Sequence, residues 1–208
     1  MDDDAARLAS AIGSRVKRER RARGWTLDQL ATSAGVSRRL LVTVEQGGAN
    51  PSVATLLRIS AALGVGLPTL VEPPASAQPV SVTRRGEGAV LWTGEAGGRG
   101  VMLAGTQPPD VVELWDWTLG PGDRLTSEAH LPGTVELLQV LEGDLVLEVD
   151  GTAVRLAPGD AARFRGDVAH AYANPATQPG ATPSRFSLVV AERGAPAAPA
   201  PGAEGHRG

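Results

Sequence analysis

Residues 26–64 read TLDQLATSAGVSRRLLVTVEQGGANPSVATLLRISAALG, and this stretch decides the fold of the first third of the chain. Thr26 is followed three residues later by Gln29, which is the pattern of a helix capping box. Ser37 and Ser52 each precede another run with apolar residues at helical spacing, as N-cap residues do. The stretch therefore predicts three short helices separated by tight turns.

The helical pattern extends on both sides of this stretch. The predicted helices lie near residues 5–23, 26–34, 37–46, 52–63 and 67–71. The second and third are joined by a turn at Gly35, which gives them the form of a helix-turn-helix. Arg38, Arg39 and Thr43 then face outward from the third helix.

The same residues resemble the helix-turn-helix of the phage-repressor (XRE-like) regulators. The resemblance rests on Leu30-Ala31-x3-Gly35-Val36-Ser37, Val44-Glu45-Gln46-Gly47-x2-Asn50-Pro51-Ser52, Thr55-Leu56-x2-Ile59 and Ala62-Leu63-Gly64-Val65. It implies that the third helix enters the major groove of double-stranded DNA. The residues expected at the DNA are Thr26, Ser37, Arg38, Arg39, Leu40, Thr43, Asn50 and Ser52. Leu40 has a second interpretation, which is packing between helices.

The charge distribution supports a polyanionic partner for this region. The chain has 208 residues and a net charge of −3, but the charges are unevenly placed. Residues 1–71 carry ten Lys/Arg and six Asp/Glu, whereas the remainder carries ten and seventeen. A basic first third on an acidic protein is typical of nucleic-acid binding.

The rest of the chain reads as short strands, which predicts a sandwich or small barrel. Asp150-Gly151 is a strong hairpin signal. The predicted strands are 88–93, 100–104, 111–119, 135–141, 145–149, 153–156, 168–173 and 186–191. We expect a DNA-binding domain at 5–71, a linker at 72–79, a β domain at 80–192 and a disordered tail at 193–208.

Two motifs in the β region resemble those of the cupin family. They are Gly122-x5-Glu128-x-His130-x5-Glu136-x6-Gly143 and Gly159-x5-Arg165-x-Asp167-x2-His170-x3-Asn174. The resemblance implies an all-β, double-stranded β-helix (jelly-roll) barrel that holds one divalent metal through His-x-His, Glu and a later His. This chain departs from that pattern because Glu128 replaces the first His and one extra residue separates His130 from Glu136.

Four side chains are the candidates for a metal or effector site: Glu128, His130, Glu136 and His170. Residues two apart on a strand share a face, so Glu128 and His130 are expected to point the same way. Such a set suits Zn, Mn, Fe or Ni, and it suits an amine ligand equally well. Tyr172 and Asn174 are further candidates for an effector pocket. Trp92, Trp115 and Trp117 are expected to serve core or dimer packing rather than ligand stacking.

These features favour a homodimeric DNA-binding regulator whose β domain binds a small effector. A metal-dependent cupin enzyme that carries its own DNA-binding domain is the alternative, and a passive dimerisation module ranks last. The absence of cysteine excludes disulfides, thiolate zinc sites and cysteine nucleophiles. With no long apolar run and an acidic start at residues 2–4, we expect a cytoplasmic protein without membrane contact.

Overall fold

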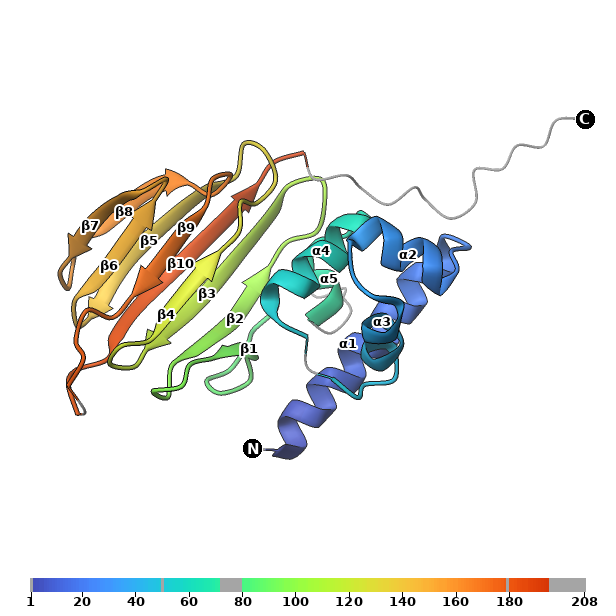
Figure 1. The fold of residues 1–208 in the computed structure, drawn as a ribbon, viewed down its shortest axis with the longest axis horizontal. Coiled ribbons are helices and arrows are strands. Elements are labelled where there is room, and N and C mark those ends of the chain that lie inside the picture. The colour runs from blue at the N-terminus through green and yellow to red at the C-terminus, as the bar shows by residue number, and fades with distance from the viewer. Residues whose placement is uncertain (1, 50, 72–79, 179, 195–208) are drawn as a thin grey trace, which may run out of the picture.

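A computed structural model describes residues 2–49, 51–71, 80–178 and 180–194 (Figure 1). The predicted order of an all-α domain followed by an all-β domain is confirmed. The helices are α1 (Asp2–Ala22), α2 (Leu27–Ala34), α3 (Arg38–Glu45), α4 (Val53–Leu63) and α5 (Leu67–Val71). The predicted linker, Asn50 and nearly all of the predicted tail lie outside the described residues. Within the described part, no helix combines the length and apolar character needed to cross a membrane.

The predicted capping residues of α2 and α3 are confirmed. Thr26 Oγ1 accepts from the backbone N–H of Gln29, and the Gln29 side chain accepts in return from the Thr26 N–H, which completes the capping box. Gly35 ends α2 in the left-handed conformation, with φ of 61°, where a side chain would be strained. Ser37 caps α3 through the backbone N–H of Leu40.

A buried ion pair fixes α1 against α3. Arg20 Nε lies 2.6 Å from Glu45 Oε1, and Arg20 Nη1 donates to the carbonyl of Trp25 at 2.8 Å. Gly13 allows the close approach, because a Cβ there would lie 2.2 Å from the Val44 carbonyl oxygen. The core of this domain consists chiefly of Ile12, Val16, Leu30, Leu41, Leu56, Ile59, Leu63 and Leu70.

The β domain has two antiparallel sheets. The larger has the order β1-β2-β3-β10-β5-β8 and the smaller the order β4-β9-β6-β7. The strands are β1 (Ala89–Thr93), β2 (Arg99–Gly105), β3 (Val111–Leu119), β4 (Arg124–Ser127), β5 (Val135–Glu142), β6 (Leu145–Val149), β7 (Thr152–Leu156), β8 (Ala161–Arg165), β9 (His170–Ala173) and β10 (Ser184–Glu192). Eight were predicted to within two residues at each end; β4 and β8 were not.

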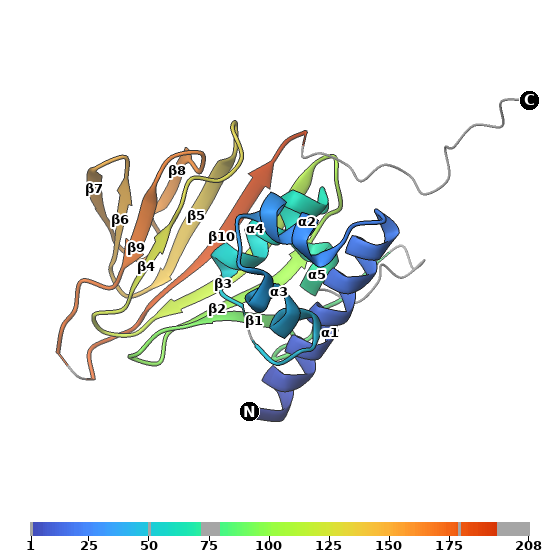
Figure 2. The same ribbon diagram turned by 45° about the vertical axis from the view of Figure 1, so that its right-hand side comes forward.

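The two sheets pack face to face, as Figure 2 shows. Every second residue of β3 is buried, so Trp115 and Trp117 point toward the smaller sheet. The ring of Tyr172 on β9 stacks on Phe186 of β10, with centroids 5.4 Å apart. The inner faces of both sheets therefore form one core, in which polar side chains of the two motifs are also placed.

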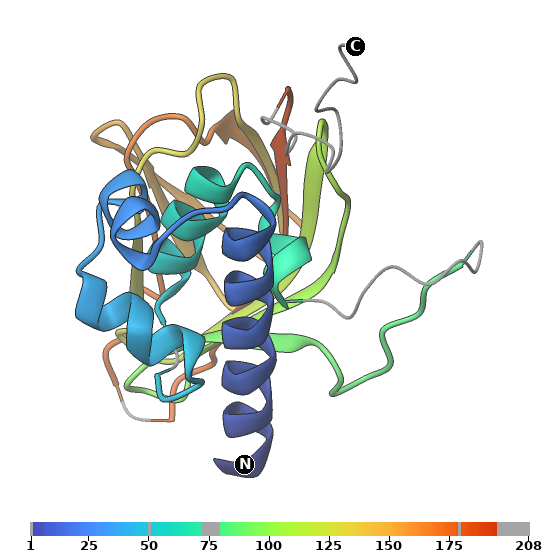
Figure 3. The same cartoon turned by 90° about the vertical axis from the view of Figure 1, so that its right-hand side faces the viewer.

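The helical domain contacts the larger sheet through the segment from Gly66 to α5. A Cβ at Gly66 would lie 3.0 Å from a methyl group of Val111, and one at Gly105 would lie 2.1 Å from the ring of Pro68. Figures 1 and 3 show α4 and α5 on the side of the helical domain that faces the sheets. The start of β3 is thus in direct contact with the helical domain.

Candidate functional site

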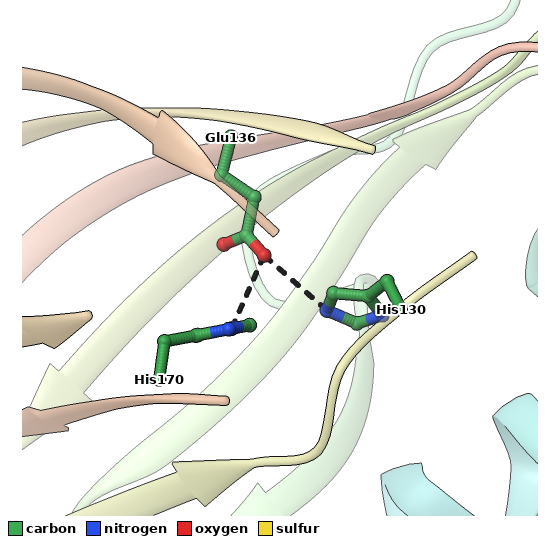
Figure 4. Close-up of side chains that lie close together, drawn as sticks. All are labelled: His130, Glu136 and His170. Atoms are coloured by element: carbon green, nitrogen blue, oxygen red, sulfur yellow. Dashed lines mark ion pairs between the residues drawn. The ribbon is translucent and has the colours of Figure 1, made fainter. Parts of the chain in front are cut away.

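Three of the four predicted ligands converge between the sheets. His130 follows β4, Glu136 lies on β5 and His170 begins β9. Glu136 Oε1 lies 3.3 Å from His130 Nε2 and 3.2 Å from His170 Nε2 (Figure 4). Ligand atoms of all three residues lie within 4.8 Å of one another. Because Glu136 alternates with outward-facing Val135 and Leu137, the strand itself aims its carboxylate inward.

Two of these converging atoms lack a hydrogen-bond partner. Glu136 Oε1 and His170 Nε2 are buried, and although they lie 3.2 Å apart they are not aligned as donor and acceptor. His170 Nδ1 lies 2.8 Å from the Val168 carbonyl, which can only accept. A neutral His170 therefore carries its proton on Nδ1, which leaves Nε2 free to act as an acceptor or as a metal ligand.

This donor set fits a divalent metal ion. Ligands about 2.1 Å from a tetrahedral ion lie about 3.4 Å from each other, close to the distances from Glu136 Oε1 to the two histidine nitrogens. The Val168 carbonyl fixes the ring of His170 as outer-shell partners of metal-bound histidines do. Three protein ligands would leave a four-coordinate ion able to take one further ligand.

The electrostatics of the cluster favour an ionised carboxylate between the imidazoles. Burial by itself would raise the pKa of Glu136, but the two histidines outweigh burial and hold it at about 2. For His130, burial lowers the pKa while Glu136 raises it, and the net shift is upward. The hydroxyl of Tyr172 donates to Glu136 Oε2, and burial and the carboxylate raise the pKa of that phenol.

Glu128, the fourth predicted ligand, is not in this cluster. It is exposed and lies at the edge of a cavity rather than beside Glu136. Glu128 and His130 do not share a strand face as predicted, because β4 ends at Ser127 and both residues lie in the connection that follows it. Three protein ligands, rather than four, are brought together.

Asn174 does not line this cavity. Its Nδ2 donates to the carbonyls of Leu119 and Thr182, and its Oδ1 accepts from the N–H of Ala176. With these hydrogen bonds, the buried amide group of Asn174 supports the turn that follows β9. Tyr172, by contrast, lines the cavity as predicted.

The cluster lies at the wall of a cavity of about 630 Å³. Trp92, Trp115 and Trp117 line it, in addition to packing on one another, with the Trp115 and Trp117 rings stacked 5.3 Å apart. Trp117 Nε1 is buried without a partner. The expectation that these residues serve packing alone is therefore incomplete.

Two further acids line the cavity and were missed at the sequence level: Glu113 and Glu192. Glu113 Oε2 accepts from Trp115 Nε1 at 3.0 Å, and burial raises the pKa of Glu113 to about 7. The alternation of β3 could have revealed Glu113, because it lies in phase with Trp115 and Trp117.

Four of the residues predicted to contact DNA, Arg38, Arg39, Leu40 and Thr43, lie on α3, whereas Asn50 lies outside the described residues. Arg38 and Arg39 are exposed, and Arg38 Nε lies 3.1 Å from Asp28 on α2. Thr43 is half-buried and donates to the carbonyl of Arg39. Leu40 is half-buried against the core, which supports its packing interpretation.

The hydroxyls of Thr26, Ser37 and Ser52 all act as helix N-caps. Each caps the N-terminal end of a helix, where free backbone N–H groups attract phosphate. The structure therefore gives these three residues a structural role that is compatible with the predicted contact with DNA backbone.

Comparisons with known proteins agree with both halves of this description. Residues 16–70 match the helix-turn-helix family model, and residues 115–185 match the cupin domain model. The HTH-type transcriptional regulator SutR of Escherichia coli is 34% identical over 167 residues, covering 80% of this chain and 89% of SutR. The chain belongs to the helix-turn-helix transcriptional regulators that carry a cupin domain.

Other members of this family are similar over most of their length. PuuR of Escherichia coli is 23% identical over 79% of this chain and 88% of its own. The crystal structure of an HTH_3 family transcriptional regulator from Vibrio cholerae superposes with a TM-score of 0.67 at 25% identity, covering 90% of this chain and 98% of that one. In the present chain, the cupin match covers the three clustered residues His130, Glu136 and His170. It does not cover Glu113 and Glu192.

Proposed function

We propose that this DNA-binding regulator senses a small molecule in the cavity between its cupin sheets. The observation that carries the proposal is the pair of buried atoms without hydrogen-bond partners, Glu136 Oε1 and His170 Nε2, at the wall of a cavity of about 630 Å³. Buried polar atoms are costly unless something satisfies them, and a cavity of this size is in the range of ligand pockets.

A divalent metal, Zn, Mn, Fe or Ni, is the proposed occupant of the His130–Glu136–His170 cluster. The ion would supply a positive coordination site for an oxygen or nitrogen atom of the effector. Glu136 would neutralise part of its charge, and Tyr172 would hold the carboxylate in place. The tryptophans and Glu113 would then contact the remainder of the effector.

On the DNA side, we propose that Arg39 and Arg38 read base edges or phosphates from α3. A guanidinium forms a bidentate pair with guanine, and Arg38 would exchange its exposed pair with Asp28 for DNA. Two chains acting on paired half-sites would supply the affinity that one small domain lacks.

Metal content tests the cavity half of the proposal. Untagged protein, purified without chelator, is expected to contain about one equivalent of one transition metal by elemental mass spectrometry. His170→Ala should lower metal affinity by more than the 10- to 100-fold that loss of an outer-shell partner costs. Glu128→Ala is the matched control and should retain the metal. Loss of metal in both variants would contradict the three-ligand site, and metal-free wild-type protein would leave an organic ligand as the occupant.

A metal-dependent enzyme remains the second candidate, because a three-ligand set with an open position is also the arrangement of catalytic metal sites. The two functions differ in what happens to a bound candidate molecule. Turnover that His170→Ala abolishes would favour the enzyme, whereas recovery of the molecule unchanged would favour the sensor.

A further inference from the structure

The cavity between the cupin sheets is not closed by the cupin domain alone. Helix α4 of the DNA-binding domain forms one of its walls. Val53, Leu57 and Ala61 follow one another at four-residue spacing along this helix, so they share one face, and Val65 lines the cavity just beyond the C-terminal end of the helix. The opposite face, with Leu56, Ile59 and Leu63, is buried in the core of the helical domain.

The cavity-facing side of α4 is mostly apolar. Ala54 and Ala61 are exposed, Leu57 is half-buried, and Arg58 is the one charged residue that α4 contributes to the wall. The cupin wall supplies Leu125 and the aromatic side chains nearby. A molecule that reaches from Glu136 across the cavity would therefore end against a surface of the DNA-binding domain.

The same helix is connected to the DNA-facing side of its domain. Ser52, which caps the N-terminal end of α4, is one of the residues expected near the DNA backbone. At the other end, the chain continues through Gly66, which lies against Val111 at the start of β3. Two residues later, β3 turns Glu113 into the cavity. Helix α4 thus has the cavity on one side and a proposed DNA contact at its end.

We propose that α4 is part of the effector site, with Leu57, Arg58 and Ala61 contacting the bound molecule. The inference rests on the proposed effector site and adds how that site is coupled to DNA. An effector that needs a changed position of α4 changes the affinity for DNA, and DNA changes the affinity for the effector by the same factor.

The chain has no cysteine, so one introduced cysteine is a unique attachment point. Ala61→Cys places it on the exposed, cavity-facing side of α4, and a thiol-reactive nitroxide attached there stands in for an effector. Ala6→Cys is the matched control, because Ala6 is an exposed helical alanine that does not line the cavity.

Two measurements are made on the labelled variants. The nitroxide should quench tryptophan fluorescence strongly in Ala61→Cys, where Trp92, Trp115 and Trp117 line the same cavity, and weakly in Ala6→Cys. Labelling should change the affinity for a duplex of the protein's own upstream region by about fivefold or more in Ala61→Cys, and by less than about twofold in Ala6→Cys.

Equal quenching in the two variants would overturn the inference whether or not DNA is bound. If labelling of Ala61→Cys left the affinity for the upstream-region duplex unchanged, the proposed coupling between α4 and DNA binding would be overturned. Failure of the unlabelled proteins to prefer this duplex over random DNA would instead count against the proposed operator binding, and the quenching experiment would still decide where α4 lies.

Discussion

Two buried glutamates inside the cupin domain titrate in opposite directions. Glu136 lies between two imidazoles, which hold its pKa at about 2. Glu113 has one neutral hydrogen-bond donor, the indole of Trp115, and burial raises its pKa to about 7. The same side chain is therefore a fixed anion at one position and a group that titrates near neutral pH at the other.

The stability of the metal-free protein should reflect Glu113. Because its folded-state pKa is raised, the unfolded chain releases this proton first, and Glu113 makes the folded state less stable as pH rises from about 4.5 to about 7. Glu113→Gln keeps an acceptor for Trp115 and removes the titration. The free energy of unfolding of Glu113→Gln, minus that of wild type, should therefore rise by up to about 3 kcal/mol between pH 4.5 and pH 8.

Urea unfolding at several pH values, in the presence of chelator, measures this difference. Glu128→Gln is the control, because Glu128 is exposed and lies outside the metal cluster. If the free energy of unfolding of Glu113→Gln ran parallel to that of wild type over the whole pH range, the assigned environment of Glu113 would be contradicted.

Glu136 acts in the opposite sense, because its folded-state pKa is lowered. Its contribution to the free energy of unfolding is present above about pH 4.5 and is lost toward about pH 2.

The sequence supplied three of the site residues and missed others for identifiable reasons. His130, Glu136 and His170 were predicted through the cupin motifs, and the structure brings them together. Glu128 was placed with them on the assumption that Glu128 and His130 lie on one strand, whereas β4 ends at Ser127. Glu113 was passed over because it lies outside both motifs, and only its phase with Trp115 reveals it.

At the scale of elements, local signals decided which predictions succeeded. Helices α2 and α4 were predicted accurately because a capping residue marks the N-terminal end of each and a glycine the C-terminal end. The strands β4 and β8 were missed: β4 has four residues, and β8 carries Arg163 and Arg165 on its exposed side. The contact of α4 with the cupin cavity depends on residues far apart in the chain, so no local pattern reveals it.

Helix α3 carries a prediction about specificity. Arg39→Ala should weaken binding to the upstream-region duplex by about 1–3 kcal/mol and weaken binding to random DNA less, because a base-reading arginine is lost. Arg163→Ala, which removes an exposed arginine of the cupin domain, is the control for net charge. Fluorescence anisotropy measures the affinity of both variants for both duplexes. If Arg39→Ala lost equal affinity for the two duplexes, Arg39 would be a phosphate contact rather than a base-reading residue.

At the scale of the whole molecule, the outer face of the larger sheet exposes neighbouring apolar side chains. Leu114 on β3 and Leu137 on β5 both pair with Val189 on β10 between them, and Val112 and Val135 extend the row. Contiguous apolar patches of this kind mark association surfaces. We expect a second copy of the chain to cover this face, which would present two α3 helices to paired half-sites.

Light scattering on a size-exclusion column tests this expectation. Wild-type protein should elute with twice the 21.4 kDa chain mass, and Leu137→Arg should shift the mass toward one chain. Val154→Arg is the matched control, because Val154 is 48% exposed, as Leu137 is, but lies on the smaller sheet. A Leu137→Arg protein that remains dimeric at the same concentrations would place the interface elsewhere.

The central claim is that the chain is a sequence-specific DNA-binding regulator. Its most direct test is fluorescence anisotropy at physiological salt, which compares a duplex of the protein's own upstream region with a random duplex of equal length. The account predicts a preference of about 10³-fold or more for the upstream region, the lower end of the range for specific regulators. Equal affinity for the two duplexes would contradict it.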